Sequence, residues 1–243
     1  MANQAIQDLK IQAAARALEY VQDGMWLGLG SGSTANCFID LLGEKFQSGS
    51  LQHIRAVPTS VATAQRAQSW GIPLFSLAQT NPGGLPHLDL AVDGADEVDP
   101  DLNLIKGLGR ALLREKVVEI HARQFIVVVD ETKVVPRLGS RGPLPVEIIQ
   151  FEAEVHVNWL NSLGCRGEQW LEQDGSPVIT DNGNFLARCW FEGGIPDAYE
   201  LAGRLAARPG IVEHGLFLDM AGLVIVAGDQ KVWTIEKQAP KAP

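Results

Sequence analysis

The sequence predicts an α/β protein that combines a Rossmann-like doubly wound parallel sheet with a smaller ferredoxin-like α+β domain. In the first half of the chain, short apolar runs of strand length alternate with segments of helical periodicity, which is typical of a parallel sheet covered by helices. After Lys133 the order of expected elements changes to strand, helix, strand, strand, helix, strand. Two final apolar runs, at residues 222–227 and 231–235, can return to the first sheet.

The expected elements of the first domain follow from apolar spacing. Helical spacing is clearest near the N-terminus, where Ile6, Leu9 and Ala13 recur on one face. We expect helices at residues 3–21, 34–46, 60–70 and 109–122. We expect strands at residues 25–30, 53–57, 72–77, 88–92 and 125–129. Ser33 or Thr34 is expected to cap the second helix.

The second domain begins after a linker at residues 137–145, which holds two glycines and two prolines. We expect helices at 153–163 and 197–207. We expect strands at 146–150, at 166–172, as a pair around 181–184, and at 211–217. The domain boundaries predicted on this basis give residues 1–142 with 215–243 for the Rossmann-like domain, and 143–214 for the small domain.

Composition excludes several classes of protein. Acidic residues outnumber basic ones by 29 to 20, and the net charge of −9 is the opposite of what a nucleic-acid binder needs. The three cysteines show no C-x-x-C spacing and the five histidines are scattered, which argues against a structural zinc site. No apolar run is long enough to span a bilayer, and no signal peptide is visible. We therefore expect a cytoplasmic protein without a membrane or nucleic-acid partner.

The first cluster that could carry chemistry is residues 28–34 (GLGSGST), between an expected strand and an expected helix. Its glycines permit close approach of the backbone to a ligand, and the helix start offers free N–H groups. The hydroxyls of Ser31, Ser33 and Thr34 add donors, so the segment suits a phosphate. It matches neither nucleotide fingerprint, because Ser33 replaces the third glycine and no lysine follows Gly32. A plain tight turn is the alternative interpretation.

The second cluster is residues 93–97 (DGADE), at the carboxyl end of an expected parallel strand. Ligands bind at this end of the strands in open α/β sheets, and Gly94 permits close approach of the backbone. A solvated acidic loop is the alternative, which further acidic residues downstream favour slightly. A magnesium site through Asp93 and Asp96 has no further support in the sequence.

The third cluster is residues 106–116, in which a lysine and two glycines precede an expected helix. This arrangement again suits an anion. Glu115 would lie about two turns inside that helix. Between Arg114 and Lys116 it can be an ordinary surface ion-pair residue. The other interpretation is a general base, because a partly buried carboxylate near the ligand edge of a sheet can move protons near neutral pH.

Lys133 follows the expected strand at residues 125–129 and so also stands at a carboxyl end, although it could be a solvent-exposed lysine. Four loops that follow expected strands thus hold glycines, hydroxyls, acids and lysines. In a chain of net charge −9, Lys106 and Lys133 stand where an anion would need them. The sequence therefore predicts an anion site at this edge of the sheet.

Taken together, these clusters resemble the A type of the ribose-5-phosphate isomerase family. The matching segments occur in the order of the family and cover nearly the whole chain. They are residues 30–35, 93–97, 106–109 with 114–116, 132–133, 143–147 and 180–184. The two-domain organisation of that family agrees with the pattern of elements described above.

The resemblance implies interconversion of D-ribose 5-phosphate and D-ribulose 5-phosphate in the non-oxidative branch of the pentose phosphate pathway, without a metal or an organic cofactor. It assigns Glu115 the role of the base that takes the C2 proton of the open-chain aldose and returns it at C1 through an enediolate. Such a reaction needs a carboxylate between two adjacent carbons and a donor for the developing oxyanion. Asp93 and Lys106 complete the implied catalytic set, and an acid there suits opening of the furanose ring.

The resemblance also implies a substrate-binding set whose partners are phosphate or sugar hydroxyls. This set consists of Ser31, Gly32, Ser33, Thr34, Asp93, Gly94, Ala95, Asp96, Lys106, Gly107, Leu108, Gly109 and Lys133. Two members depart from the family: Ser31 stands where threonine is frequent, and Leu108 stands where glycine is common. Leu108 could change substrate preference if it faced the ligand. We expect it to point into the protein, with its backbone N–H still available.

Other functions remain open on the same scaffold. They include a sugar-phosphate deaminase or lactonase, a coenzyme A transferase with a glutamate nucleophile, and a non-catalytic sugar-phosphate sensor. The sensor is disfavoured because no DNA-binding segment is attached and the candidate base Glu115 is present. The resemblance implies a homodimer or homotetramer.

Overall fold

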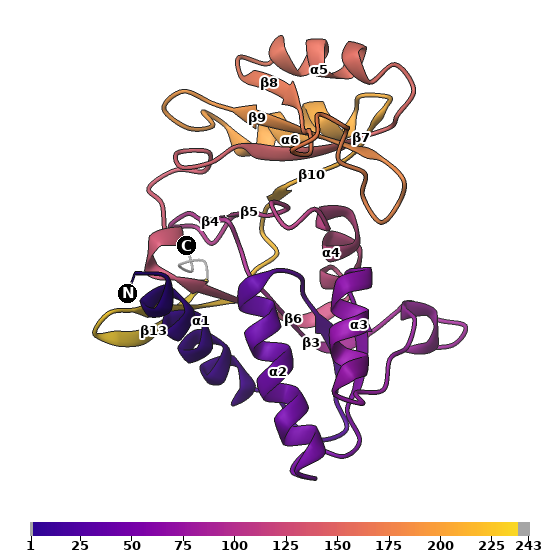
Figure 1. The fold of residues 1–243 in the computed structure, drawn as a ribbon, viewed down its shortest axis with the longest axis vertical. Helices are drawn as coiled ribbons and strands as arrows, with labels where there is room; N and C mark the ends of the chain where they lie inside the picture. Colours follow the sequence, from indigo (N-terminus) through magenta and orange to yellow (C-terminus); the bar gives the residue numbers. More distant parts are fainter. Residues whose placement is uncertain (1, 238–243) are drawn as a thin grey trace, which may run out of the picture. The chain divides into compact units, whose positions relative to one another are not determined.

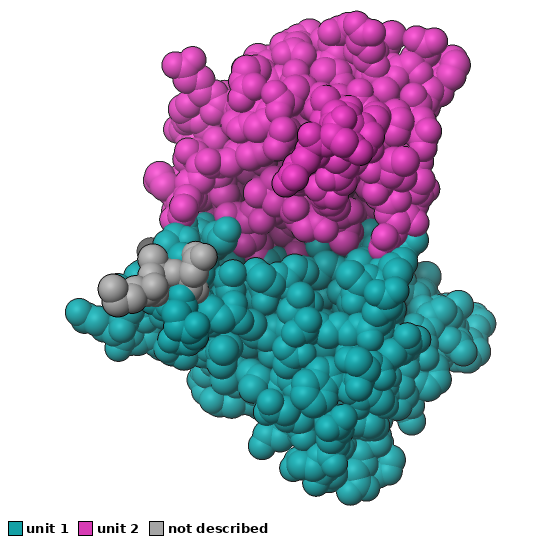
Figure 2. Space-filling view, viewed as in Figure 1, with its two compact units in different colours: residues 1–94, 114–133, 220–243 teal, residues 95–113, 134–219 magenta. Residues whose placement is uncertain are grey.

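The computed structural model describes residues 2–237, with side chains from Gln4 onward, and the chain divides into two compact units (Figures 1 and 2). Unit 1 comprises residues 1–94, 114–133 and 220–243. Unit 2 comprises residues 95–113 and 134–219. Each unit has a sheet and a hydrophobic core of its own.

The division differs from the boundaries expected after residues 142 and 214, because residues 95–113, 134–142 and 215–219 belong to unit 2. The physical reason is a three-stranded sheet that the sequence did not predict. Its strands are β4 (Glu97–Val98), β5 (Leu104–Ile105) and β11 (Leu216–Phe217). Since β5 pairs with both β4 and β11, the segments that contain these three strands belong to one sheet.

Unit 1 is built on a six-stranded sheet in the order β13-β12-β6-β3-β1-β2. The strands are β1 (Trp26–Leu29), β2 (Arg55–Pro58), β3 (Leu88–Asp93), β6 (Ala122–Asp130), β12 (Leu223–Gly228) and β13 (Lys231–Glu236). All pairings are parallel except that of β13 with β12. The return of the last two strands to the first sheet is confirmed. The expected strand at 72–77 is wrong: Leu74 forms only a bridge with Ala56, because Pro73 lacks an N–H donor.

Helices cover both faces of this sheet, which confirms the doubly wound α/β prediction (Figure 1). They are α1 (Ala2–Leu18), α2 (Ser33–Gln47), α3 (Val61–Ser69) and α4 (Leu112–Glu119). On one face, α1 and α2 bury residues such as Ala13 and Phe38 against the strands. On the other face, Val118 of α4 packs with Val57 and Leu88. A side chain at Gly28 would meet Val118 at 3.0 Å, so glycine permits this close packing.

Helix α4 is shorter than the expected range of 109–122. It begins at Leu112 because Gly107 and Arg110 have φ values of 106° and 69°, which are left-handed and incompatible with a helix. Glu115 consequently lies in the first turn of the helix and not two turns inside it.

Unit 2 contains a four-stranded antiparallel sheet in the order β10-β7-β9-β8. Its elements are β7 (Leu144–Ile148), α5 (Ala153–Asn161), β8 (Arg166–Gln169), β9 (Phe185–Trp190), α6 (Ala198–Ala206) and β10 (Ile211–His214). The succession βαββαβ confirms the ferredoxin-like arrangement. Of the pair expected around 181–184, only β9 is a strand. The strand expected at 211–217 is split at Gly215, where a side chain would lie 2.2 Å from the carbonyl oxygen of Lys106.

Candidate functional site

The expected site segments of unit 1 lie at the carboxyl ends of three neighbouring strands. Residues 31–34 follow β1, Asp93 ends β3, and Lys133 lies in the short helix η2 (Glu131–Lys133) after β6. The chain leaves β1 toward β2 on one side, while β3 lies on the other. Ligands bind at such a reversal of strand order in open α/β sheets. The structure therefore brings the first glycine-rich turn and Asp93 to the expected position.

Asp93 is held against the first glycine-rich turn. Its Oδ1 accepts hydrogen bonds from the backbone N–H groups of Ser31 at 3.0 Å and Gly94 at 2.7 Å. The carboxylate occupies the space above Gly30, where a Cβ atom would lie only 2.0 Å from the Asp93 carboxyl carbon. The sequence places glycine at this position because the aspartate needs that space. Asp93 is fully buried, so the solvated acidic loop is not what forms here.

The start of α2 is open to an anion. Its N-cap is Gly32, with φ 102°, and no side-chain hydrogen bond caps the helix, so the expected cap by Ser33 or Thr34 is wrong. The N–H groups of the first turn have no acceptor within the helix. They carry the positive end of the helix dipole, which attracts anions. Gly32 and Ser33 are exposed, so a ligand can reach these groups.

Lys10 lies beside the expected anion site, and sequence reasoning did not select it. It lies on α1, and its Nζ donates a hydrogen bond to Ser33 Oγ at 2.9 Å. A positive charge is thereby added beside the open start of α2. Lys10 lies 23 residues before Ser33 and carries no motif, so only the packing of α1 against α2 reveals it.

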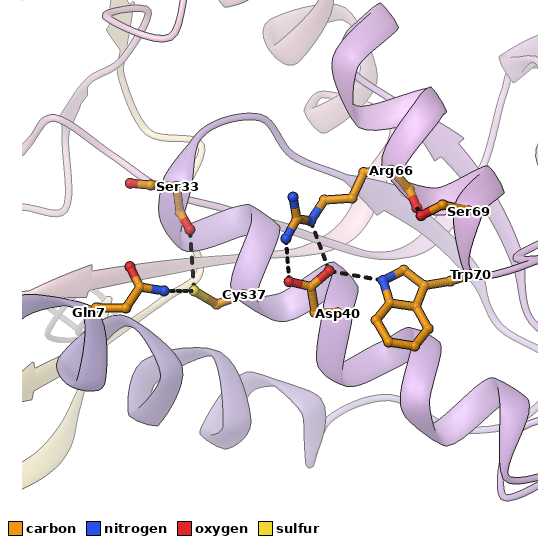
Figure 3. Close-up of polar contacts among 7 residues, drawn as sticks. All are labelled: Gln7, Ser33, Cys37, Asp40, Arg66, Ser69 and Trp70. Carbon is orange, nitrogen blue, oxygen red and sulfur yellow. Dashed lines mark hydrogen bonds and ion pairs between the residues drawn. The ribbon is translucent and has the colours of Figure 1, made fainter. Parts of the chain in front are cut away.

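Polar contacts with both neighbouring helices fix the orientation of α2 (Figure 3). Gln7 of α1 donates to Cys37 Sγ at 3.2 Å, and that thiol donates to the carbonyl of Ser33 at 3.3 Å. Farther along, Asp40 accepts from Trp70 Nε1 at 2.9 Å. Arg66 Nε of α3 donates to the same carboxylate at 2.8 Å, and the ion pair raises the pKa of this guanidinium. The helix that presents the anion site is therefore braced from two sides (Figure 3).

Ser31 is surrounded by other hydroxyl groups. Its Oγ lies within hydrogen-bonding distance of Thr59, Ser60 and Thr63, which follow the neighbouring strand β2. Sequence reasoning did not select these three residues. Their hydroxyl-rich run directly after a parallel strand was the available signal.

Glu115 is buried, with 2 % of its surface exposed, which contradicts the interpretation as a surface ion-pair residue. It lies in the first turn of α4, where the positive end of the helix dipole stabilises a negative charge. A carboxylate removed from bulk water at such a position can accept a proton from a ligand. The position is therefore suited to the general base.

The second glycine-rich turn, residues 106–109, belongs to unit 2. The backbone of Lys106 donates to the carbonyl of Gly215 at 2.9 Å. Its side chain is 2 % exposed, and Nζ lies 5.4 Å from the centre of the Phe217 ring, within the range of a cation–π interaction. Gly107 needs its φ of 106°, and a Cβ atom there would approach Leu112 at 2.8 Å. Lys106 is therefore held by main-chain geometry and by an aromatic ring.

Leu108 differs from its expected arrangement. Its backbone N–H donates to Asp96 Oδ2 at 2.9 Å, so the expectation that this N–H remains available is wrong. The bond forms because residues 96 and 108 flank the paired strands β4 and β5. A Cβ atom on Gly142 would lie 3.9 Å from Leu108 Cδ1, which places this side chain near the loop before β7. The hydrogen bond from the Leu108 N–H orients the carboxylate of Asp96.

The predicted site residues divide between the units. Unit 1 holds Ser31, Gly32, Ser33, Thr34, Asp93, Gly94, Glu115 and Lys133. Unit 2 holds Ala95, Asp96, Lys106, Gly107, Leu108 and Gly109. The chain passes directly from one set to the other after Gly94. Among residues 2–237, no cluster of three or more histidines, cysteines and carboxylates could hold a metal ion, so the magnesium hypothesis gains no support.

Comparison with known proteins adds independent findings. The family model described as ribose 5-phosphate isomerase A (phosphoriboisomerase A) matches residues 55–231. The chain is 46 % identical to ribose-5-phosphate isomerase A of Roseiflexus sp. (strain RS-1), over 95 % of this chain and 96 % of the relative. It is 48 % identical to the Nitrobacter hamburgensis protein of the same name, over 95 % and 98 %. A solved D-ribose-5-phosphate isomerase in complex with phospho-erythronic acid superposes with a TM-score of 0.90 and 41 % identity, over 95 % of this chain and 99 % of that chain.

Proposed function

The chain belongs to the ribose 5-phosphate isomerase A family, and we propose that Glu115 is the general base of its reaction. The enzyme is an aldose–ketose isomerase that interconverts D-ribose 5-phosphate and D-ribulose 5-phosphate. The observation that carries the proposal is the burial of Glu115 in the first turn of α4. No observation favours a deaminase, a lactonase, a coenzyme A transferase or a sensor.

The phosphate of the substrate binds at the start of α2. Support comes from the uncapped N–H groups after Gly32, the positive end of the helix dipole, and the Lys10 ammonium at Ser33. Thr34 lies close by, because a Cβ atom on Gly94 would be 3.8 Å from its Cβ. Lys133, after the strand β6, adds a second positive charge at the same edge of the sheet. These charges attract an anion to a protein of net charge −9.

Glu115 carries out the proton transfer. Its carboxylate takes the proton from C2 of the open-chain aldose, the electron pair of that bond forms the C1–C2 double bond, and the aldehyde oxygen becomes the oxyanion of the enediolate. The same carboxylic acid then returns the proton to C1, while the hydroxyl proton of O2 passes to O1, so that C1 carries a hydroxyl group and C2 becomes the ketone carbon. No atoms are gained or lost, so no cofactor is needed to balance the reaction.

Lys106 acts on the negative charge that develops during this proton transfer, and Asp93 acts in the opening of the sugar ring. The buried ammonium of Lys106 stabilises the enediolate oxygen, because a preorganised positive charge away from bulk water has a large effect on a developing anion. Asp93, which two backbone N–H groups hold in place, accepts the proton of the anomeric hydroxyl as the C1–O4 bond of the furanose breaks, and returns it to the ring oxygen. Asp96 and the turn at 106–109 bind the remaining hydroxyls of the sugar.

The assembly and the compartment are further parts of the proposal. We propose that the enzyme is a homodimer or homotetramer in the cytoplasm. No helix within residues 2–237 is both long and apolar enough to cross a bilayer. Light scattering across a wide concentration range tests the assembly, and a monomer mass at every concentration would refute it.

Proton NMR of the purified enzyme with ribose 5-phosphate in D₂O, with a chelator present, tests the reaction. The expected result is ribulose 5-phosphate that carries solvent deuterium at C1, since the proton held on the base exchanges with solvent before the base returns it to the enediolate. Saturable binding without any ketose would refute the isomerase. Ketose formation abolished by the chelator would refute the metal-free mechanism.

Glu115→Gln tests the base, because glutamine keeps the shape but cannot accept the proton. We expect kcat to fall by roughly 10² to 10⁴-fold with substrate binding retained, the usual contribution of a general base. Glu119→Gln is the matched control, since it removes a buried carboxylate from the same helix one turn later. Wild-type turnover in Glu115→Gln would show that another residue is the base.

A further inference from the structure

Four hydroxyl side chains meet beside the first glycine-rich turn, and of these only Ser31 belongs to the predicted site. Ser31 follows β1, Thr59 and Ser60 follow the adjacent strand β2, and Thr63 lies in the first turn of α3. Thr59, Ser60 and Thr63 are buried, with exposed fractions of 0 %, 9 % and 1 %. Buried hydroxyls are nearly always hydrogen-bonded, so their partners decide what the group does.

The distances define a continuous network of hydrogen bonds, in which Ser31 Oγ also lies 3.0 Å from Thr63 Oγ1. Ser31 Oγ lies 2.8 Å from Ser60 Oγ, and Ser60 Oγ lies 2.9 Å from Thr63 Oγ1. Thr63 Oγ1 lies 2.8 Å from the carbonyl oxygen of Gly30. At the other end, Thr59 Oγ1 lies 2.8 Å from Ser31 Oγ. We call these four side chains the hydroxyl chain.

Counting the hydroxyl protons shows which group donates and which accepts at each hydrogen bond of the hydroxyl chain. A hydroxyl group has one proton to donate and two lone pairs that accept. The carbonyl of Gly30 can only accept, so Thr63 donates to it and accepts from Ser60. Ser60 in turn accepts from Ser31, which leaves Thr59 as the donor to Ser31. The hydroxyl proton of Ser31 is therefore committed within the protein and is not offered to a ligand.

The hydroxyl chain and Asp93 hold the same two residues of the turn. Thr63 binds the carbonyl of Gly30, while the N–H of Ser31 donates to Asp93 Oδ1 at 3.0 Å. These are the two ends of one peptide unit, because the Gly30 carbonyl and the Ser31 N–H share an amide plane. Rotation of that plane would weaken both bonds together. The orientation of the Asp93 carboxylate therefore depends on the Thr63 hydroxyl.

We propose that Thr63 is a positioning residue for the isomerisation, which fixes the Gly30–Ser31 peptide and through it the carboxylate of Asp93. Ser31 serves the site through the hydroxyl chain and its backbone N–H, and not as a hydroxyl donor to the substrate. This inference rests on the proposed function, since it gives Asp93 a supporting group for the same reaction. Misplacement of a reacting group by about 1 Å can cost roughly 10²-fold in rate, so such support has a measurable effect.

Capping of α3 is the competing explanation for these hydroxyls, and it accounts for only one of them. Ser60 is the N-cap, and its Oγ accepts from the backbone N–H of Thr63 at 3.0 Å. The Thr63 hydroxyl donates away from α3, to the carbonyl of Gly30. Replacement of Thr63 by valine, which has nearly the same shape, therefore removes the bond to the turn and leaves the cap in place.

The test compares Thr63→Val with Thr63→Ser and with a matched control. Thr80→Val is the control, because Thr80 also lies in unit 1 and its hydroxyl donates to a carbonyl, that of Leu77, at 2.7 Å. For Thr63→Val we expect kcat to fall by roughly 10 to 100-fold, with KM changed by less than about 3-fold. Thr63→Ser restores the hydroxyl and is expected to recover kcat to within about 3-fold of wild type. Thr80→Val is expected to keep wild-type kcat.

Three results would overturn the inference: wild-type kcat in Thr63→Val, an equal loss in Thr63→Ser, or an equal loss in Thr80→Val. Amide NMR spectra provide a readout that needs no turnover. In Thr63→Val the N–H resonances of Ser31 and Gly94, which both donate to Asp93, should shift, and Thr63→Ser should return them. An inactive wild-type enzyme would refute the proposed function alone. Unshifted amides would refute the positioning role, whatever the activity.

Discussion

The two glycine-rich turns of this protein look alike in sequence, but they are held in different ways. The turn at residues 30–34 follows a strand of the large parallel sheet and is fixed by side chains, Asp93 and Thr63. The turn at 106–109 follows a two-residue strand and is fixed both by the main chain, through the bond from Lys106 to the Gly215 carbonyl, and by the Asp96 side chain, which accepts from the Leu108 N–H. The first turn leads into α2 with its N–H groups exposed, whereas the second leads into α4 through a left-handed Arg110.

This difference suits the two turns to different chemical groups. Open N–H groups at the start of a long helix suit a phosphate, which needs several donors at once. A buried lysine over an aromatic ring suits a single developing oxyanion, which needs one strong positive charge. The role of a glycine-rich segment is therefore set by the helix that it leads into and by the groups that support it, and not by its glycines.

The largest effect is expected at Gly30. Gly30→Ala would place a Cβ atom 2.0 Å from the carboxyl carbon of Asp93, so the aspartate or the turn must move. We expect kcat/KM to fall by at least roughly 10²-fold, because the carboxylate that we propose for ring opening is displaced by more than about 1 Å. Steady-state kinetics measures this, with Gly203→Ala on the open surface of α6 as the control. Equal activity in the two variants would show that Asp93 does not depend on the turn.

Gly107→Ala tests the main-chain support of the second turn. The φ of 106° and the approach to Leu112 at 2.8 Å both oppose a side chain, so we expect a loss of about 1–3 kcal/mol in the free energy of unfolding. Gly109→Ala is the comparison in the same turn, because a Cβ atom there meets nothing within 4 Å, and it should keep wild-type stability. Denaturant unfolding measures both values. Equal stability of the two variants would contradict this account of the turn.

A smaller effect is expected at Lys10. Lys10→Ala removes an exposed charge beside the start of α2, so KM should rise by roughly 3 to 10-fold while kcat stays near wild type. Salt screens exposed charges, and the difference should therefore shrink as ionic strength rises. Lys45→Ala, in the last turn of the same helix, is the control and should keep the wild-type KM. A fall in kcat instead of a rise in KM would place Lys10 at the chemistry and not at the phosphate.

The smallest effect is expected at Leu108. Leu108→Gly restores the residue common in the family and keeps the backbone N–H that binds Asp96. We expect less than about a 3-fold change in kcat/KM and a loss of about 0.5–1 kcal/mol in stability from the added backbone freedom. Kinetics with ribose 5-phosphate and with other pentose phosphates measures this. A marked change in substrate preference would show that the Leu108 side chain faces the ligand.

Much of this site was predictable because parallel strands bring their carboxyl ends to one edge. The positions of Asp93, Lys133 and residues 31–34 follow from the strand pattern alone. The strands β4 and β5 were not predictable, since a strand of two residues shows no periodicity. Because the prediction lacked these strands, it placed the domain boundary elsewhere. The start of α4 was also missed, because Arg110 adopts a left-handed φ, which is uncommon for residues other than glycine and cannot be predicted from an arginine.

Contacts between residues far apart in the chain were beyond sequence reasoning. Lys10 reaches Ser33, and Thr63 reaches Gly30, only once α1 and α3 have packed beside the turn. The bond from the N–H of Leu108 to Asp96 likewise depends on the pairing of β4 with β5. Such contacts reflect tertiary packing, which local propensity does not determine.

An amide NMR titration of the enzyme with inorganic phosphate tests most directly whether the two turns divide the substrate in this way. We expect phosphate to shift the N–H resonances of Ser33, Thr34 and Ala35 at the start of α2, and to leave those of residues 107–109 unchanged. Saturable shifts at 107–109, with none at the start of α2, would contradict this expectation.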